Sequence, residues 1–322
     1  MNRGNILLVL LRKVHTFLFT KRNLLSLFEI NIDSAQYIGQ DASELIKQKI
    51  ESRIPFVVGR LGIELNVLLN YKELELPKLV YCRKYITRQL YYNGWDKNNN
   101  LLLCKNAGFF PNEISQIEKF SKLMIQEIKH VDIWGCFYSA EKQFEQELSH
   151  TIKIRLTDID PFLHKNPWSE SLSGKKVLVI HPFEKTIISQ YKKREFIFEN
   201  KKILPNFELK TIKAVQSIAN SNSEFKDWFE ALNSMKIKIK NTDFDIAIIG
   251  CGAYSLPLAT YIKSLGKSAI YLGGATQILF GIKGKRWEEY PPVASLFNEY
   301  WVRPLPEETP AQSKEVEDGC YW

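Results

Sequence analysis

The sequence has few cysteines, and none of them stands in a metal-binding spacing. Its five cysteines form no Cys-x-x-Cys pair, and their number is odd. A zinc ribbon needs paired cysteines, and a small secreted fold held by disulfides needs an even set. The sequence fits neither class, and reduced thiols in a cytosol are the simpler expectation.

A long apolar run is also missing near the N-terminus. The run Ile6–Leu11 has six residues and is followed by Arg12 and Lys13. A spanning helix needs about 20 apolar residues, and the apolar core of a signal peptide about 7–15. The first 35 residues instead predict a basic amphipathic segment. Such a segment can lie on an anionic membrane surface or pack as a helix on the domain.

Several familiar catalytic motifs are absent. The sequence has no Ser-His-Asp order, no His-Glu-x-x-His and no P-loop. A dinucleotide fingerprint is incomplete, because Ser255 stands where its third glycine would fall and no acid follows Gly273-Gly274. These features disfavour an NAD enzyme.

The charge of the chain is its first positive signal. The 322 residues include 44 Lys and Arg against 36 Asp and Glu, a formal net charge of +8. This excess suits an anionic partner such as a phosphate, a nucleotide or an acidic membrane face. No recognisable nucleic-acid module occurs, so no nucleic acid is expected. A solvated basic surface explains the charge equally well.

Strand and helix patterns alternate along the second half. Continuous apolar runs predict buried strands at Lys176–His181, Phe244–Gly250 and Ser268–Leu272, with helical patterns between them. The first half adds shorter strand patterns at Phe56–Gly59 and Val131–Trp134. This rhythm predicts an α/β fold with a Rossmann-like parallel sheet and covering helices.

Composition divides the chain into four predicted regions. A connecting stretch that ends near Ser173-Gly174 suggests the main boundary. The regions are a basic amphipathic leader (1–35), an N-terminal α/β region (36–172), a Rossmann-like region (173–303) and a C-terminal tail (304–322).

A glycine turn follows the second strand pattern of the C-terminal half. Gly250 and Gly252 would let the backbone approach a ligand, and Tyr254 stands where a helix opens. Free N–H groups at a helix N-terminus bind phosphate, and ligands of open sheets bind at the carboxyl ends of strands. The alternative is a tight turn with no ligand.

A second glycine turn comes after the third strand pattern. Gly273 and Gly274 allow close approach, and Gln277 follows them. Lys283 and Arg286 then supply cations that suit phosphate oxygens. This pattern predicts a diphosphate site, with a solvated basic turn as the alternative.

The remaining candidate residues are polar side chains and an aromatic at strand ends or turns. Arg60 and Glu64 follow an early strand, where they can belong to a functional site or form a buried ion pair. Asn106 and Phe109 occupy a turn that can face a sugar or border the core. His181 ends a strand and can act in proton transfer or serve structure. Asp158 and Asp160 form an Asp-x-Asp triplet, a weak candidate for Mn²⁺ or Mg²⁺.

Together these residues resemble a family of bacterial proteins found among polysaccharide-assembly enzymes. The similarity covers roughly residues 54–322 and includes the Gly319–Trp322 ending. Its motifs are His181-Pro182-Phe183, Gln190-Tyr191, Leu204-Pro205, Gly250–Tyr254, Leu272–Gly274, Gln277, Phe280–Gly284 and Arg286-Trp287.

That family is in turn similar to glycosyltransferases of the GT-D fold. Those enzymes carry an Arg-x-Gly-Asp-Gly-Glu element after an early strand and use an Asp-x-Glu feature with a divalent metal. Arg60–Glu64 resembles a version of this element that is one residue shorter and lacks the Asp. Glu64 is therefore the only matching acid, and a need for Mn²⁺ or Mg²⁺ does not follow.

The resemblance implies a GT-D-like fold and transfer of a sugar from a nucleotide-sugar donor, with a UDP-sugar favoured. The acceptor would be a glycan or a lipid-linked sugar in surface polysaccharide (capsule) biosynthesis. Region 173–303 would bind the nucleotide sugar, and region 36–172 would face the acceptor. The protein would be cytoplasmic, with peripheral contact to the inner membrane face.

In this hypothesis two glycine turns and a cationic loop converge into one pyrophosphate pocket. The expected donor-binding residues are Gly250, Gly252, Tyr254, Gly273, Gly274, Gln277, Lys283 and Arg286. The expected catalytic residues are Glu64, Arg60 and His181, and Asn106 and Phe109 would face the acceptor. Two alternatives stay open: another nucleotide-using enzyme, such as a methyltransferase, and a non-catalytic basic module that binds membrane or RNA.

Overall fold

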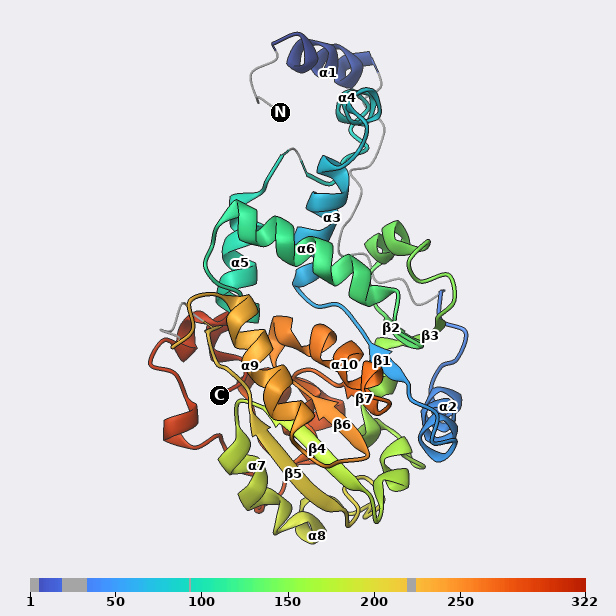
Figure 1. The fold of residues 1–322 in the computed structure, drawn as a ribbon, viewed down its shortest axis with the longest axis vertical. Helices are drawn as coiled ribbons and strands as arrows, with labels where there is room; N and C mark the ends of the chain where they lie inside the picture. The colour runs from blue at the N-terminus through green and yellow to red at the C-terminus, as the bar shows by residue number, and fades with distance from the viewer. Residues whose placement is uncertain (1–5, 19–33, 93, 219–223) are drawn as a thin grey trace.

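The protein is built on one parallel β-sheet with helices on both faces (Figure 1). The structure, a computed structural model, describes residues 6–18, 34–92, 94–218 and 224–322. Within these residues seven strands pair in the order β3-β2-β1-β7-β6-β4-β5, and every pair is parallel. The prediction of a Rossmann-like α/β fold with a parallel sheet is confirmed.

The elements have the following bounds. The strands are β1 Val57–Gly59, β2 Ile133–Cys136, β3 Ile152–Arg155, β4 Lys176–His181, β5 Glu208–Lys213, β6 Ile246–Ile249 and β7 Ser268–Tyr271. The helices of the first half are α1 Ile6–Leu18, α2 Gln40–Glu51, α3 Glu64–Leu74, α4 Lys78–Ile86, α5 Lys97–Ala107 and α6 Ile114–Ile128. Those of the second half are α7 Glu184–Tyr191, α8 Arg194–Ile197, α9 Trp228–Lys240, α10 Ser255–Ser264, α11 Ala275–Leu279, α12 Lys285–Glu288 and α13 Pro291–Ala294.

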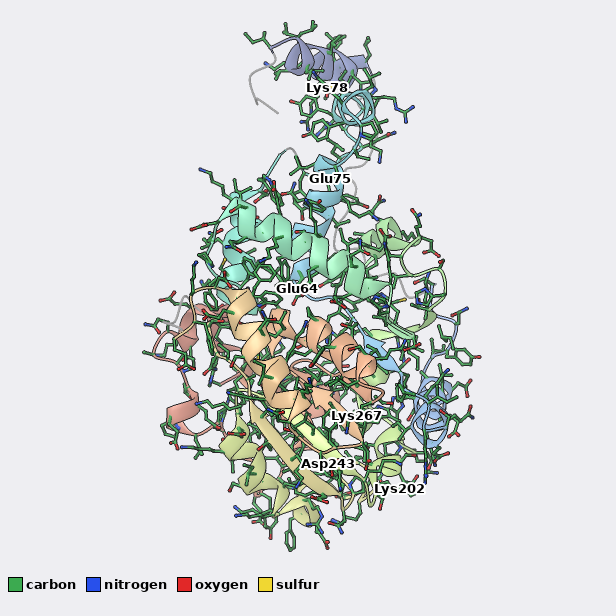
Figure 2. The ribbon with its side chains drawn as sticks, in the orientation of Figure 1. Glu64, Glu75, Lys78, Lys202, Asp243 and Lys267 are labelled. Carbon is green, nitrogen blue, oxygen red and sulfur yellow. The ribbon has the colours of Figure 1, made fainter. Side chains whose placement is uncertain are left out.

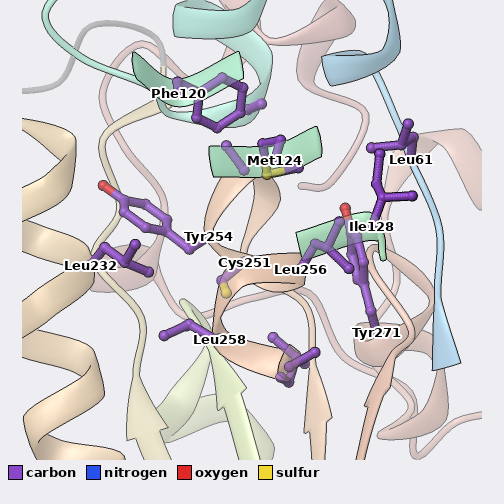
Figure 3. Packing of buried hydrophobic residues seen from close by; sticks show 14 of the residues in the cluster. Leu61, Phe120, Met124, Ile128, Leu232, Cys251, Tyr254, Leu256, Leu258 and Tyr271 are labelled. Carbon is purple, nitrogen blue, oxygen red and sulfur yellow. The ribbon is translucent and has the colours of Figure 1, made fainter. Parts of the chain in front are cut away.

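The sheet is buried on both faces. Successive side chains of each strand point to opposite faces, so each strand contributes to the apolar cluster on either side. Val57 of β1 packs into one apolar cluster and Val58 into the other. The same alternation holds in β6, where Ala247 and Ile248 face opposite clusters. Residues of α3, α5, α6, α9 and α10 contribute to the first cluster, part of which Figure 3 shows, and residues of α2, α7 and α11 to the second.

The predicted boundary between residues 172 and 173 lies within the span of this single sheet. Strands β1 to β3 precede the boundary and β4 to β7 follow it. The two sets meet where β1 pairs with β7, with Val58 opposite Ile270. The carboxyl ends of β1 and β7 therefore lie next to each other, at the edge of the sheet where open α/β folds bind ligands.

The C-terminal tail is tied to the sheet's carboxyl edge. The buried carboxylate of Glu308 accepts hydrogen bonds from the backbone N–H groups of Lys185 (2.7 Å) and Thr186 (3.2 Å) in the first turn of α7. An acid is favourable there because of the helix dipole. The tail thereby returns Tyr321 and Trp322 to the region of β7.

Helices α1 and α4 form a tip that projects from the body beyond the end of α3 (Figure 1). Helix α1 lies in the predicted leader, of which residues 1–5 and 19–33 lie outside the described residues. Among the residues that the structure describes, no helix is both long and apolar enough to cross a membrane.

Candidate active site

Arg60 lies at the adjoining carboxyl ends of β1 and β7. It follows β1 directly, and its guanidinium carbon is 5.6 Å from the ring centroid of Tyr271, the last residue of β7. A methyl group added at Gly273 would lie 3.2 Å from Arg60 Nη1. The Arg60 Nε is buried and has no hydrogen-bond partner among the described residues. A buried donor without a partner is costly, and a bound acceptor would remove that cost.

Glu64 stabilises the loop that carries Arg60. Its carboxylate is buried, and its Oε2 accepts a hydrogen bond of 2.8 Å from the backbone N–H of Gly62. Burial raises the pKa of Glu64, while the two backbone N–H groups of Gly62 and of Glu64 itself and the charge of Arg60 oppose the rise. This carboxylate is committed to holding the loop between β1 and α3.

Glu141 stabilises the loop after β2 in the way that Glu64 stabilises the loop after β1. Its Oε2 accepts from Trp134 Nε1 at 2.8 Å, and its Oε1 accepts from the backbone N–H of Tyr138 at 3.1 Å. Burial raises the pKa of Glu141, and the charge of Arg60 is among the causes that lower it. Two strand-end loops are thus held by buried acids beside one guanidinium.

Asp160 is the acid near Arg60 that holds no loop. It follows β3, and its carboxylate accepts no hydrogen bond from the residues that the structure describes. Burial raises its pKa to about 7, the nearby charge of Arg60 lowers it, and the like charge of Asp158 raises it further. A carboxyl group with such a pKa exchanges a proton near neutrality, as a general base must.

The tail and the second glycine turn close the other side of Arg60. A methyl group at Gly274 would lie 2.9 Å from a ring carbon of Tyr321 and 3.8 Å from Trp287. Burial raises the pKa of Tyr321, which the charges of Arg286 and Arg60 both lower. The charges of both arginines therefore act on the Tyr321 hydroxyl.

Arg286 is held by the tail. Its guanidinium carbon is 5.2 Å from the ring centroid of Tyr321, and its Nη2 forms an ion pair with Glu317. Its backbone N–H donates to the carbonyl of Cys320 at 3.1 Å. The charges of Arg286 and Arg60 also both lower the pKa of Tyr138, which burial raises. Arg60, Asp160, Gly273, Arg286 and Tyr321 define what we call the carboxyl-edge cluster.

One solved structure that matches this chain is the selenomethionine-substituted structure of a domain of unknown function, DUF1792. The identity is 14%, the TM-score is 0.36, and the alignment covers 83% of this chain and 96% of that chain. No protein-family model and no curated protein matches this chain. The fold assignment therefore rests on the sheet itself, and the functional argument on the cluster.

The first glycine turn is filled by protein atoms. A methyl group at Gly250 would lie 2.4 Å from the carbonyl oxygen of Gly273, and one at Gly252 2.6 Å from that of Ala107. The backbone N–H of Cys251 already donates to Ser255 Oγ at 3.0 Å. These glycines allow other segments of the protein to pack closely against the turn. The geometry therefore does not support the predicted contact of this turn with a diphosphate.

Tyr254 is a core residue. It is buried, stacks on Trp228 with ring centroids 5.1 Å apart, and has its hydroxyl 3.2 Å from Ser217 Oγ. Figure 3 shows it between Leu232 and Phe120. The ring packs α10 against α9, away from the carboxyl-edge cluster.

Gly252 provides a stability test of this packing. It has φ +59°, and Gly252→Ala would add both backbone strain and a clash with Ala107. We expect a loss of about 2–4 kcal/mol in the free energy of unfolding. Gly266→Ala is the matched control, with φ +76° and open space around the added methyl, and should cost about 1 kcal/mol. Urea unfolding measures both, and equal losses would contradict the close packing at Gly252.

His181 is a buried structural histidine. Burial lowers its pKa to about 3, and its Nδ1 accepts a hydrogen bond of 3.0 Å from the backbone N–H of Phe183. The proton of the neutral ring is therefore on Nε2. With so low a pKa the ring stays neutral at physiological pH, which does not fit the expected part in proton transfer.

The two residues predicted to face the acceptor, Asn106 and Phe109, lie in different surroundings. Phe109 is 1% exposed and packs against Phe120 and Trp228 with ring centroids 4.9 and 5.6 Å away, so it belongs to the core. Asn106 Nδ2 donates to Glu317 Oε1 at 3.4 Å, and Glu317 also pairs with Arg286. Asn106 therefore lies on the Arg286 side of the cluster.

Two donor-side candidates also have protein partners. Lys283 Nζ lies 5.6 Å from the ring centroid of Phe297. Gln277 Nε2 donates to the carbonyls of Ile282 and Tyr321, both at 3.2 Å. The Oε1 of Gln277 is buried and has no partner among the described residues. Gln277 ties the cationic loop to the tail.

Asp158 is engaged in a salt bridge and does not fit a metal site. Its two oxygens accept from Arg155 at 2.7 and 3.1 Å, and Oδ2 also accepts from the backbone N–H of Gly39 at 2.7 Å. No group of three or more His, Cys, Asp or Glu suited to a metal ion occurs in the part of the chain that the structure describes. The weak metal prediction for Asp158 and Asp160 is not supported by this geometry.

A cavity of about 430 Å³ is lined by Asp158 and not by Asp160. It lies at the carboxyl end of β3 and is large enough for a sugar-sized ligand. Its lining includes Arg155, Asp158, His164, Lys165 and Tyr290. The sequence patterns did not reveal this cavity, Tyr138 or Glu141. The cavity joins segments far apart in the chain, as does the contact of Tyr321 with Gly274.

Proposed function

We propose that the protein is a glycosyltransferase that moves a sugar from a nucleotide-sugar donor, with a UDP-sugar favoured, to a hydroxyl group of a glycan or lipid-linked acceptor. The observation that supports this most is Arg60, whose unpartnered Nε is buried at the adjoining carboxyl ends of β1 and β7. The similarity of Arg60–Glu64 to the GT-D element points to the same residues. The proposal stands on the parallel sheet, the cluster and the sequence resemblance together.

The donor diphosphate would lie between Arg60 and Arg286. When the sugar is transferred, the bond between the anomeric carbon and the diphosphate oxygen breaks, and its electron pair leaves with the nucleotide. Two guanidinium groups fixed in place stabilise that developing charge, which is the main electrostatic demand of the reaction. Gly273 has no side chain that would lie against Arg60 Nη1.

Asp160 would accept the proton of the attacking hydroxyl. The new bond joins the acceptor oxygen to the anomeric carbon, and the proton passes to the Asp160 carboxylate. Its pKa of about 7 suits this transfer, whereas the Glu64 carboxylate is held by Gly62. This assignment moves the base from Glu64, where the sequence pattern placed it, to Asp160.

Turnover with a panel of UDP- and GDP-sugars tests the proposal. Release of nucleoside diphosphate in the presence of a glycan or lipid-linked acceptor mixture would support it. Bound S-adenosylmethionine in the purified protein, with no turnover of any sugar donor, would favour a methyltransferase instead. No turnover and no nucleotide binding by folded protein would end the proposal.

A further inference from the structure

Helix α1 presents an apolar face to solvent. None of its 13 residues is buried, and Leu7, Leu10, Val14, Phe17 and Leu18 are all more than half exposed, Phe17 at 83%. These positions follow the helical repeat, so they share one side of the helix. A soluble helix usually buries such a stripe, and a large apolar patch left open marks an interaction surface.

Helix α4 extends the same surface. It packs against α1, with the guanidinium carbon of Arg12 4.7 Å from the ring centroid of Tyr85. Only Tyr81 of α4 is buried, and Leu79 is 85% exposed. The two helices therefore cover each other only in part and leave apolar side chains on the outside of the tip.

The charges on the tip are all of one sign. Helix α1 carries Arg12 and Lys13, and helix α4 carries Lys78, Arg83 and Lys84, while neither helix contains an Asp or Glu. Exposed apolar side chains beside cations are the composition that binds the boundary between headgroups and acyl chains of an anionic membrane.

The tip is also placed to reach such a surface. Figure 2 shows Glu64, Glu75 and Lys78 in order from the body to the tip, along α3. Helix α3 has 11 residues, which spans roughly 15 Å at 1.5 Å per residue. In Figure 1 the tip stands above α3 and the rest of the body lies below it. The apolar side chains of α1 and α4 are exposed in this arrangement.

We infer that α1 and α4 together form a docking element that lies in the surface of an anionic lipid bilayer. The apolar stripe enters the boundary between headgroups and acyl chains, and the lysines and arginines contact lipid phosphates. A second copy of the chain is the less suitable occupant, because two identical basic tips would repel each other. The inference adds α4 to the predicted leader and does not depend on the proposed reaction.

Sedimentation with lipid vesicles tests the inference on the full-length protein. We expect binding to vesicles of phosphatidylcholine mixed with phosphatidylglycerol, weaker binding to phosphatidylcholine alone, and a decrease with salt. Leu10→Glu with Phe17→Glu, and Leu79→Glu separately, should each reduce the bound fraction at least about tenfold. Lys13→Glu with Lys78→Glu should reduce binding only to the anionic vesicles.

Ile237→Glu is the matched control, since Ile237 is 63% exposed on α9 of the body. It should bind vesicles like the wild type, and circular dichroism should show all variants folded. The inference is overturned if the wild type does not bind anionic vesicles, or if Ile237→Glu loses as much binding as the tip variants. It is also overturned if sedimentation velocity shows a dimer that the tip substitutions dissociate.

Discussion

Replacing Arg60 by alanine is expected to lower sugar transfer by about 10²–10³-fold, the usual effect of removing one donor that stabilises charge in the transition state. The guanidinium is placed by the loop after β1 and has a buried Nε free to meet a phosphate oxygen. Arg60→Lys should recover only part of the loss, because an ammonium group cannot replace the planar fork. Steady-state release of nucleoside diphosphate measures the effect.

A second measurement separates this function from a purely structural one. Arg60 lowers the pKa of Asp160, so its removal should move the pH midpoint of the residual rate above that of the wild type. Arg194→Ala is the control, because Arg194 pairs with Glu195 and stacks on Tyr191, outside the cluster. Full activity in Arg60→Ala, or an equal loss in Arg194→Ala, would contradict the assignment.

Asp160→Asn is expected to reduce turnover by about 10²–10⁴-fold, the range for loss of a general base. In the wild type the rate should rise with pH and level off above about 7, because the base must be deprotonated. This rise should be absent in the variant. Glu64→Gln, whose amide oxygen can still accept from Gly62, should stay within about tenfold of the wild type. A larger loss in Glu64→Gln than in Asp160→Asn would return the base to Glu64.

The same substitution should change stability with pH. The pKa of Asp160 is raised above its ordinary value of 3.8 to about 7, so the folded protein holds a proton that the unfolded chain releases between these values. The folded state therefore loses stability as pH rises from about 4 to 7. Asp160→Asn removes this loss. At pH 8 the free energy of unfolding of the variant should exceed that of the wild type by on the order of 1 kcal/mol.

The central strands could be predicted from sequence because they are buried on both faces. The runs in β4, β6 and β7 are almost continuously apolar, and their predicted and observed bounds agree within one or two residues. The edge strands β3 and β5 could not be predicted. Their sequences IKIR and ELKTIK alternate charged and apolar residues, and most of their side chains are only partly buried or exposed.

Helix ends were predicted less well than helix positions. The helical patterns between the strands did not mark where α9 begins. It begins at Trp228, because Asp227 caps it by accepting from the backbone N–H of Glu230 at 2.9 Å. The strand expected at Val131–Trp134 is instead Ile133–Cys136. Helix α5 had no amphipathic pattern to reveal it, since its sequence begins KNNN.

Sequence patterns could predict only those residues of the candidate site that directly follow a strand. Arg60 was selected because a polar residue after an apolar strand sits at a sheet's carboxyl edge. A glycine in a sequence is ambiguous as a sign of a binding site. The sequence shows that the side chain is missing, but it does not show whether a ligand or another part of the protein occupies the space. At Gly252 the space is taken by Ala107, and at Gly273 it faces Arg60. Tyr321 carries no local signal, because only the return of the tail brings it to Gly274.

Calorimetric titration of UDP and GDP into the wild type and Arg60→Ala, at matched protein concentration, tests the central claim most directly. The account predicts that at least one nucleoside diphosphate binds the wild type and that the variant binds it at least about tenfold more weakly, a difference of roughly 1.4 kcal/mol. Equal affinity for the two proteins, or no binding of either nucleotide by folded wild type, would contradict it.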